Sequence, residues 1–275
     1  MYKKEAEMRL KEYQRAMEEE ELSPRTIRKY VADIKRWLNL QGDIIESADM
    51  IKYKDNLMKS YAARSVNSKL IPVNRYLKWL GYSELTVKTR HIQGCGSLEN
   101  VISKNEYIKM LDFAKRTSRW KMYYIMRTIA LTGIRISELQ YITVEAVEAG
   151  SAEIYSKGKY RRIYIPHKLA DELISYCKKK EIKKGYVFPG KKEEKCISSV
   201  AVWKNMKYIA GRVDVAKENV YPHSLRHLFA KTYMHEIGDI TELSDLLGHS
   251  RLETTWIYTK TTGAEKRQRL NRISL

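Results

Sequence analysis

The chain has 275 residues, 43% of them hydrophobic, which is enough to bury one large core or two modest ones. It carries 52 basic and 33 acidic residues, and the excess lies mainly in residues 101–275, which hold 33 basic and 19 acidic residues. This charge favours a polyanionic partner, although a basic protein without such a partner can have the same composition. No apolar run is long enough for a membrane span, and residues 1–20 lack the apolar core of a signal peptide. Three scattered cysteines argue against a disulfide framework or a zinc site and favour a reducing cytoplasm.

The first eighty residues predict a helical bundle. A charged helix is expected over about 3–20, and Ser23 followed by Pro24 is typical of the start of the next helix. Apolar residues then recur at helical spacing. Two more helices are predicted near 46–60 and 65–80, and Gly81 is expected to end the second of them. The basic residues left on the outer face of the second helix are Arg25, Arg28, Lys29, Lys35 and Arg36.

A linker is predicted between two domains. Residues 83–102 show no sustained helical pattern and contain a glycine-rich stretch. The expected domains on either side are residues 1–82 and residues 103–275. The first is predicted to be entirely helical, and the second to be mixed α/β, so the predicted fold class is mainly α with a small antiparallel β-sheet.

The second domain shows one change of pattern. Ser103 and Glu106 form a capping box that predicts its first helix, and helical patterns continue to about Leu139. From about 152 to 165, two short segments rich in isoleucine and tyrosine lie on either side of a glycine-containing turn, which predicts a β-hairpin. Helical patterns then return.

An arginine interrupts an apolar stretch of this domain, in the segment Thr-Gly-Ile-Arg135-Ile-Ser-Glu138. Burying a guanidinium without a partner is unfavourable. Three possibilities stay open for Arg135: its side chain reaches solvent, it pairs with an acid such as Glu138, or it binds an anion.

A second segment, Tyr221-Pro222-His223-Ser-Leu-Arg226-His227, places polar side chains at helical spacing. If Pro222 begins a helix, His223 and Arg226 lie on one face, and the first turn offers free N–H groups to an anion. Because most such pairs are ordinary surface residues, the spacing alone is a weak signal.

Two further polar positions follow. Gly248 is predicted to end a helix and to place His249 in a tight turn. Ser250 and Glu253 resemble a capping box, which predicts another helix after the turn. Tyr258 lies shortly beyond, and since the chain has 20 tyrosines, this one by itself would more often be a core residue than a nucleophile.

Together these segments resemble the active-site signature of the tyrosine recombinases, also called the phage integrase family. The matching motifs are Thr-Gly-Ile-Arg-Ile-Ser-Glu-Leu, Ser-Lys-Gly-Lys, His-Ser-Leu-Arg-His, and Leu-Gly-His-Ser followed eight residues later by Tyr-Thr. The resemblance is strong over 101–262. In the N-terminal part it depends on Ser-Pro-Arg-Thr-Ile-Arg-Lys-Tyr and on the helical pattern, which look like the family's SAM-like core-binding domain.

The resemblance implies a site-specific DNA recombinase that cleaves and rejoins strands through a covalent 3′-phosphotyrosine. It makes Tyr258 the nucleophile, and Arg135 and Arg226 the cations that bind the phosphate oxygens as negative charge accumulates there. A phenol has a pKa near 10, so a base must take its proton, and His223 is the family's candidate. His249 is implied as a hydrogen-bond donor to the phosphate.

Lys157 is implied as the acid that protonates the leaving 5′ oxygen. Lys159 is its rival in the same turn, and Lys157 is favoured because it precedes the glycine, as the family's lysine does. Glu138 is expected to orient the site from behind Arg135. No metal or other cofactor is expected, because the covalent phosphotyrosine stores the energy of the cleaved phosphodiester, and the rejoining step uses it.

The implied partner is double-stranded DNA, bound by a homotetramer whose subunits are monomers off DNA and act in the cytoplasm, at the nucleoid. The tail, about 264–275, is expected to be a helix that docks on a neighbouring subunit, and the alternative is that it folds back on its own domain. Contacts to DNA are expected from Arg25, Arg28, Lys29, Arg64, Lys69, Lys159 and Arg161.

Three other functions compete with this interpretation. A type IB topoisomerase shares much of the chemistry but has a lysine where this chain has His223. A DNA-binding regulator without catalysis would not need the full set of catalytic residue types present here. A general polyanion or RNA binder would lose only a surface contact in a Tyr258→Phe variant.

The position of Tyr258 raises a geometric question. In one straight α-helix over 250–258, Tyr258 would lie about 12 Å along the axis from Ser250. Either the chain bends near Thr254 and Thr255, which are β-branched, or another contact directs the helix toward the phosphate.

Overall fold

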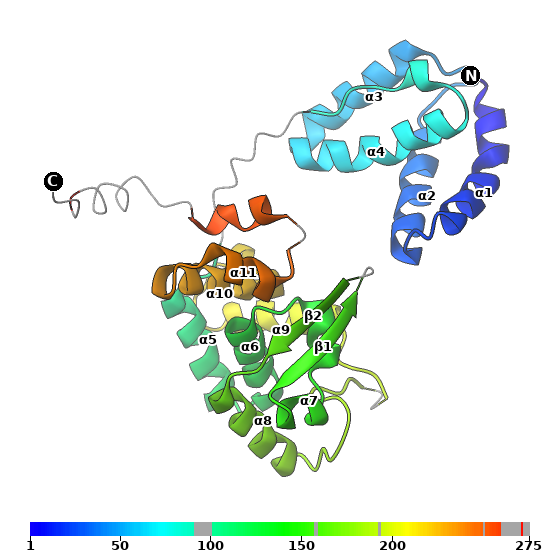
Figure 1. The fold of residues 1–275 in the computed structure, drawn as a ribbon. Helices are drawn as coiled ribbons and strands as arrows, with labels where there is room; N and C mark the ends of the chain where they lie inside the picture. The colour runs from blue at the N-terminus through cyan, green and yellow to red at the C-terminus, as the bar shows by residue number, and fades with distance from the viewer. Residues whose placement is uncertain (91–100, 157–158, 192–193, 250, 260–270, 272–275) are drawn as a thin grey trace. The chain divides into compact units, whose positions relative to one another are not determined.

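A computed structural model describes residues 1–90, 101–156, 159–191, 194–249, 251–259 and 271 (Figure 1). The chain divides into two compact units, residues 1–95 and residues 96–275. The described residues are mainly helical and contain one two-stranded antiparallel sheet, so the predicted fold class is confirmed. Within these ranges, every helix is too short or too polar to cross a lipid bilayer.

The N-terminal unit is a bundle of helices with its own core. Ser23 caps the second helix, since its Oγ accepts a hydrogen bond from the N–H of Thr26 at 3.2 Å, and Pro24 occupies the first helical position as predicted. The core includes Trp37 and Tyr76, both inaccessible to solvent. The elements are α1 (Lys3–Glu19), α2 (Pro24–Leu38), α3 (Ser47–Ser60), α4 (Ala63–Trp79) and the 3₁₀ turn η1 (Ser83–Leu85).

The C-terminal unit places its helices around α6, which packs against α5, α8 and α10. The predicted capping box at Ser103 and Glu106 is present and opens α5. The elements are α5 (Lys104–Arg116), α6 (Trp120–Thr132), η2 (Ile136–Tyr141), α7 (Val144–Glu148), β1 (Ser151–Ser156), β2 (Lys159–Tyr164), α8 (His167–Lys179), α9 (Ser199–Ala210), η3 (Lys217–Asn219), α10 (Pro222–Glu236), α11 (Ile240–Leu247), η4 (Leu252–Thr254) and η5 (Trp256–Thr259).

Helix α6 ends earlier than the sequence pattern suggested. Gly133 follows it with φ +63°, in the left-handed region, and the chain continues through the 3₁₀ turn η2 rather than as α-helix to Leu139. A Cβ at Gly133 would lie 2.5 Å from Cδ1 of Phe229 on α10. The glycine thus ends the helix, lets α10 approach closely, and directs the chain into the segment that carries Arg135.

The predicted hairpin is present as β1 and β2. The two strands pair antiparallel, with Ile154 opposite Arg161 and Ala152 opposite Ile163. Along β2 the exposed residues Tyr160 and Tyr164 alternate with Arg161 and Ile163, whose side chains lie on the inner face. This inner face of β2 contacts α11.

The two helix boundaries predicted near the polar motifs are confirmed. Pro222 begins α10, and Gly248 ends α11 with φ +60°. The helix expected after the turn is wrong for the described residues: Ser250 lies outside them, and 251–259 form the two 3₁₀ turns η4 and η5. The chain bends at Thr255, whose fully buried hydroxyl lies 2.8 Å from Nδ1 of His249. This bend places η5 against α10.

Candidate active site

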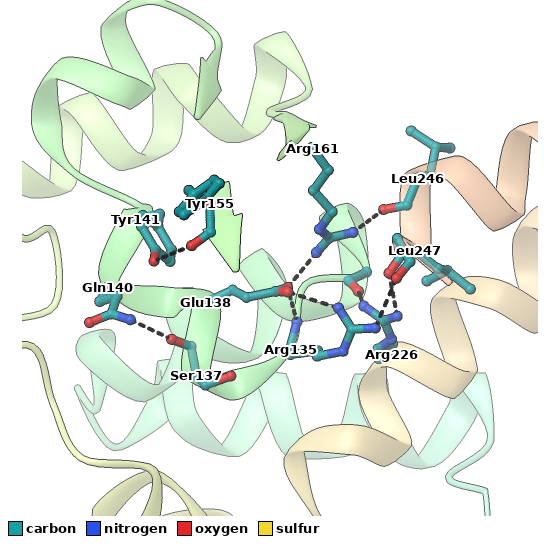
Figure 2. A network of polar contacts seen from close by, with 12 residues as sticks. Arg135, Ser137, Glu138, Gln140, Tyr141, Tyr155, Arg161, Arg226, Leu246 and Leu247 are labelled. Atoms are coloured by element: carbon teal, nitrogen blue, oxygen red, sulfur yellow. Dashed lines mark hydrogen bonds and ion pairs between the residues drawn. The ribbon is translucent and has the colours of Figure 1, made fainter. Parts of the chain in front are cut away.

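Glu138 lies between two arginines from different elements (Figure 2). Its Oε1 accepts from Nη1 of Arg135 at 2.9 Å, and its Oε2 accepts from the backbone N–H of Arg135 at 2.7 Å. The same Oε2 accepts from Nη2 of Arg161 on β2. The Glu138 side chain is 7% exposed, so these bonds replace the water that a carboxylate needs. One carboxylate therefore joins the segment after α6 to the hairpin.

Three arginines bind consecutive carbonyls at the end of α11. Arg161 donates to the carbonyl of Leu246, Arg226 to that of Leu247, and Arg135 to that of Gly248, the last at 3.1 Å. The final carbonyls of a helix lack intrahelical partners and form the negative end of its dipole. The two preceding carbonyls are bound by backbone N–H groups beyond the helix. Three arginines that are far apart in the sequence therefore come together at the end of α11.

Arg226 is the most enclosed of these cations. It is inaccessible to solvent, and its Nη1 donates to the carbonyl of Gly133 at 2.6 Å. Burial, followed by the charges of Arg135 and Arg161, lowers the pKa of Arg226 to about 9. Its Nε has no hydrogen-bond partner among the described residues. Only one carboxylate, Glu138, accompanies the three guanidinium groups in this network, so the cluster is suited to binding an anion.

Arg135 satisfies two of the possibilities left open by the sequence. It pairs with Glu138, and 37% of its side chain remains accessible to solvent. Figure 2 shows its guanidinium beside that of Arg226, at the end of α11. The two arginines predicted to bind one phosphate therefore lie together, although they come from distant parts of the chain.

Two histidines lie within the field of these arginines. Desolvation, together with the charges of Arg226 and Arg135, lowers the pKa of His223 and lowers that of His249 to about 4. Both rings are therefore neutral at pH 7. His223 lies in the first turn of α10 and is exposed, whereas His249 is half-buried.

Tyr258 lies in a small apolar cluster between α10 and α11. It is 6% exposed and packs with residues that include Ala230 and Leu243. Burial raises the pKa of Tyr258 to about 12, although the charges of Arg226 and Arg135 act in the opposite direction. Its hydroxyl lies 2.6 Å from Nδ1 of His227. The histidine that touches the predicted nucleophile is therefore a different one from His223.

Three predictions fall wholly or partly outside the described residues. Lys157, the predicted acid, is outside them, and so is the side chain of Lys159. The described ends of the hairpin, Ser156 and Lys159, pair with each other on either side of the turn. The predicted tail helix over 264–275 is also outside, apart from residue 271.

The side chains predicted to contact DNA have different surroundings. Arg25, Arg28, Lys29 and Arg64 are exposed on the N-terminal unit, and Lys69 is half-buried. Lys29 also links α2 to α4, because its Nζ donates to the carbonyl of Ser68 at 2.8 Å. Nζ of Lys69 lies 4.8 Å from the centre of the Tyr61 ring.

Arg161 differs from this group. Its side chain is 12% exposed and turned inward to Glu138, and its contact with DNA stays a prediction. The reason is its position on β2, on the same face as the buried Ile163 and Ile165. That period-two pattern was the available signal for its inward orientation. For His227, the signal was its spacing of four from His223, which places both on one helix face.

Similarity to known proteins extends over both units. The family model described as "phage integrase family" matches residues 100–265, and "phage integrase, N-terminal SAM-like domain" matches residues 10–84. The chain belongs to the phage integrase family. This integrase is 31% identical over 274 residues to tyrosine recombinase XerA of Pyrococcus horikoshii, covering 97% of this chain and 93% of that protein. It is 28% identical over 260 residues to XerA of Thermococcus kodakarensis, covering 92% and 90%.

Solved structures share the fold of this integrase at lower identity. A lambda integrase dimer bound to a COC′ core site has a TM-score of 0.74 at 16% identity, covering 92% of this chain and 95% of that chain. XerH site-specific recombinase bound to its difH substrate has a TM-score of 0.70 at 18% identity, covering 90% and 78%. The family resemblance inferred from the motifs is confirmed, and the integrase is an enzyme of the tyrosine recombinase class.

Proposed function

We propose that this recombinase cleaves and rejoins double-stranded DNA through a covalent bond between Tyr258 and a 3′ phosphate. The observation that carries the proposal is the convergence of Arg135 and Arg226 on adjacent carbonyls, with His223, His249 and Tyr258 around them. These groups are the ones that attack at a phosphodiester requires: fixed cations, hydrogen-bond donors and a nucleophile.

In this proposal the scissile phosphate binds at the arginines. Arg135 offers an accessible guanidinium, and Arg226 offers a buried one whose Nε lacks a partner among the described residues. A phosphate bound at Arg135 would supply countercharge to the neighbouring buried Arg226 as well, and the attraction would grow as the phosphorus gains negative charge in the transition state. Glu138 would hold Arg135 in position from behind through its two bonds to that residue.

The histidines would handle hydrogen bonds and protons. If the hydroxyl of Thr255 donates to Nδ1 of His249, the proton of that neutral ring lies on Nε2, which can donate to a phosphate oxygen. His223, also neutral at pH 7, would take the phenol proton of Tyr258 as the oxygen attacks phosphorus. Lys157 would protonate the departing 5′ oxygen, because an alkoxide is a poor leaving group at neutral pH.

The partners follow from the same chemistry. The solved structures that share the fold of this enzyme include XerH bound to difH substrate and a lambda integrase tetramer bound to a Holliday junction. We infer that this enzyme likewise binds DNA, as a homotetramer on two sites, in the cytoplasm at the nucleoid. The exposed cations of the N-terminal unit, among them Arg25, Arg28 and Arg64, would contact the DNA backbone, and such binding weakens as salt rises.

The test captures the covalent intermediate from a mixture of all sequences, so it also identifies the target. Purified enzyme is mixed with a pool of random-sequence duplexes that each carry a nick, so that a cleaved strand can dissociate and leave the enzyme attached. Adducts are recovered under denaturing conditions and sequenced. We expect wild type to form adducts enriched in one sequence and Tyr258→Phe to form none. Adducts spread evenly over all sequences would indicate topoisomerase-like cleavage, and no adduct from wild type would contradict the proposed function.

A further inference from the structure

The hydroxyl of Tyr258 has a partner that the roles above leave unused. Nδ1 of His227 lies 2.6 Å from it. His227 follows Arg226 directly and lies one turn after His223 on α10, with the two imidazole centres 4.7 Å apart. The bond joins residues 31 positions apart, so it forms only once η5 has packed against α10.

The direction of this hydrogen bond depends on the protonation of both groups and on the tautomer of His227. Burial, followed by the charges of His223 and Arg226, lowers the pKa of His227 to about 4, and burial raises the pKa of Tyr258 to about 12. At neutral pH the ring is therefore neutral and the phenol keeps its proton. The hydroxyl has no other acceptor among the described residues, so its proton is satisfied when it donates to Nδ1, which leaves the ring's own proton on Nε2.

The apolar neighbours of Tyr258 do not fix the direction of its hydroxyl. Side chains such as Ala230, Leu243 and Leu247 confine the ring by packing, which is non-directional. Rotation about the C–O bond is restrained by a hydrogen bond, and the one partner of this hydroxyl among the described residues is His227. A misplaced nucleophile loses rate steeply, by up to about a hundredfold for an error near 1 Å.

We propose, on the basis of the proposed function, that His227 is a positioning residue that holds the hydroxyl of Tyr258 by its proton before attack. The oxygen lone pairs that form the bond to phosphorus are then turned away from the His227 ring. His223 acts next: once phosphate is bound, the O–H turns from Nδ1 of His227 to His223, which takes the proton as the oxygen bonds to phosphorus. A ring with a pKa of about 4 accepts this hydrogen bond but is a weak base for a phenol with a pKa of about 12, so His227 positions the hydroxyl and does not remove its proton.

The test compares amides that mimic different ring nitrogens. In His227→Asn the side-chain oxygen can reach the place of Nδ1, whereas in His227→Gln the amide extends toward the place of Nε2. His227→Leu offers no acceptor. The probe is the nicked duplex recovered with wild type, and the readouts are DNA affinity and the single-turnover rate of adduct formation. His235→Leu, which removes an exposed histidine from the same helix, is the matched control.

We expect His227→Gln and His227→Leu to form the adduct about ten- to a hundredfold more slowly than wild type, with unchanged DNA affinity. His227→Asn and His235→Leu should stay close to wild type. Thermal melting of each variant identifies any that fails to fold, and the Asn and Gln variants are polar and of similar size, so their comparison remains informative. Equal rates for Asn and Gln, whether both slow or both fast, would overturn the proposal.

A second readout separates positioning from proton removal. Replacing Tyr258 by 3-fluorotyrosine gives a more acidic phenol, which should partly restore a variant that lacks the base, His223→Gln. It should not restore His227→Leu, and restoration there would also overturn the proposal. Adduct formation by wild type but not by Tyr258→Phe is required in both experiments, so failure of the proposed function is detected separately.

Discussion

The side chain of Arg161 lies directly against the backbone of Gly248. A Cβ at position 248 would come within 2.5 Å of Cδ of Arg161. From this place the guanidinium reaches both Glu138 and the carbonyl of Leu246. Gly248 therefore meets two requirements at once: the left-handed conformation that ends α11, and room for the arginine that ties β2 to the helix end.

Gly248→Ala should therefore destabilise the protein more than an alanine at another left-handed glycine. Gly150, with φ +69°, has nothing within 4 Å of the added Cβ, so it is the matched control. We expect a loss of about 1 kcal/mol in the free energy of unfolding for Gly150→Ala, from backbone strain. Gly248→Ala should lose about 2–4 kcal/mol, since the collision adds to the strain. Urea denaturation measures both, and equal losses would contradict the contact with Arg161.

The ion pair of Glu138 with Arg161 should show strong coupling in a double-mutant cycle. We expect Glu138→Gln and Arg161→Met to be non-additive in unfolding free energy by about 1–3 kcal/mol, because each removes one charge of a buried ion pair. The exposed pair of Glu153 with Arg162 on the same hairpin is the control. Its cycle should show no measurable coupling, since solvent screens both charges. Coupling as weak for Glu138 as for Glu153 would contradict the buried network.

The two arginines of the phosphate site should differ in what they contribute to stability. Arg226→Lys removes hydrogen bonds to two carbonyls in a fully buried place, and we expect a loss of about 3 kcal/mol in unfolding free energy. Arg135→Lys should change stability little, because that side chain is partly exposed. Both variants should slow adduct formation by about a hundred- to a thousandfold. Calorimetry and single-turnover rates test this, and a stable Arg226→Lys enzyme would argue against its structural bonds.

Acid should destabilise the folded chain through His227 and His249. Both have a pKa of about 4 in the folded protein, below the ordinary value of 6.5. Between these values the unfolded chain binds more protons, so stability falls as pH decreases from 6.5 toward 4 and is fully present above 6.5. We expect each ring to contribute about 3 kcal/mol of this fall. His249→Asn should flatten the dependence of melting temperature on pH, and a slope parallel to wild type would contradict the shift.

Local signals predicted several boundaries correctly. The Ser23 cap, the Ser103 capping box, Pro222 and Gly248 all act within a few residues, so their effect can be read without the rest of the fold. The early end of α6 at Gly133 was missed, because apolar residues continue past the glycine and resemble a longer helix. The 3₁₀ turns after His249 were not predicted, and the bend near Thr254 and Thr255 was one of two possibilities left open, since it depends on the buried contact between Thr255 and His249.

The sequence by itself determined the family, the helical and hairpin elements, and the set of residue types that the chemistry needs. These properties reside in motifs of a few consecutive residues. Only the tertiary structure decided which groups meet: Arg226 binds a carbonyl 93 residues away, Arg135 one that is 113 residues away, and the hydroxyl of Tyr258 shares a hydrogen bond with His227. Such contacts depend on how α6, α10 and α11 pack, and packing is a property of the folded chain as a whole.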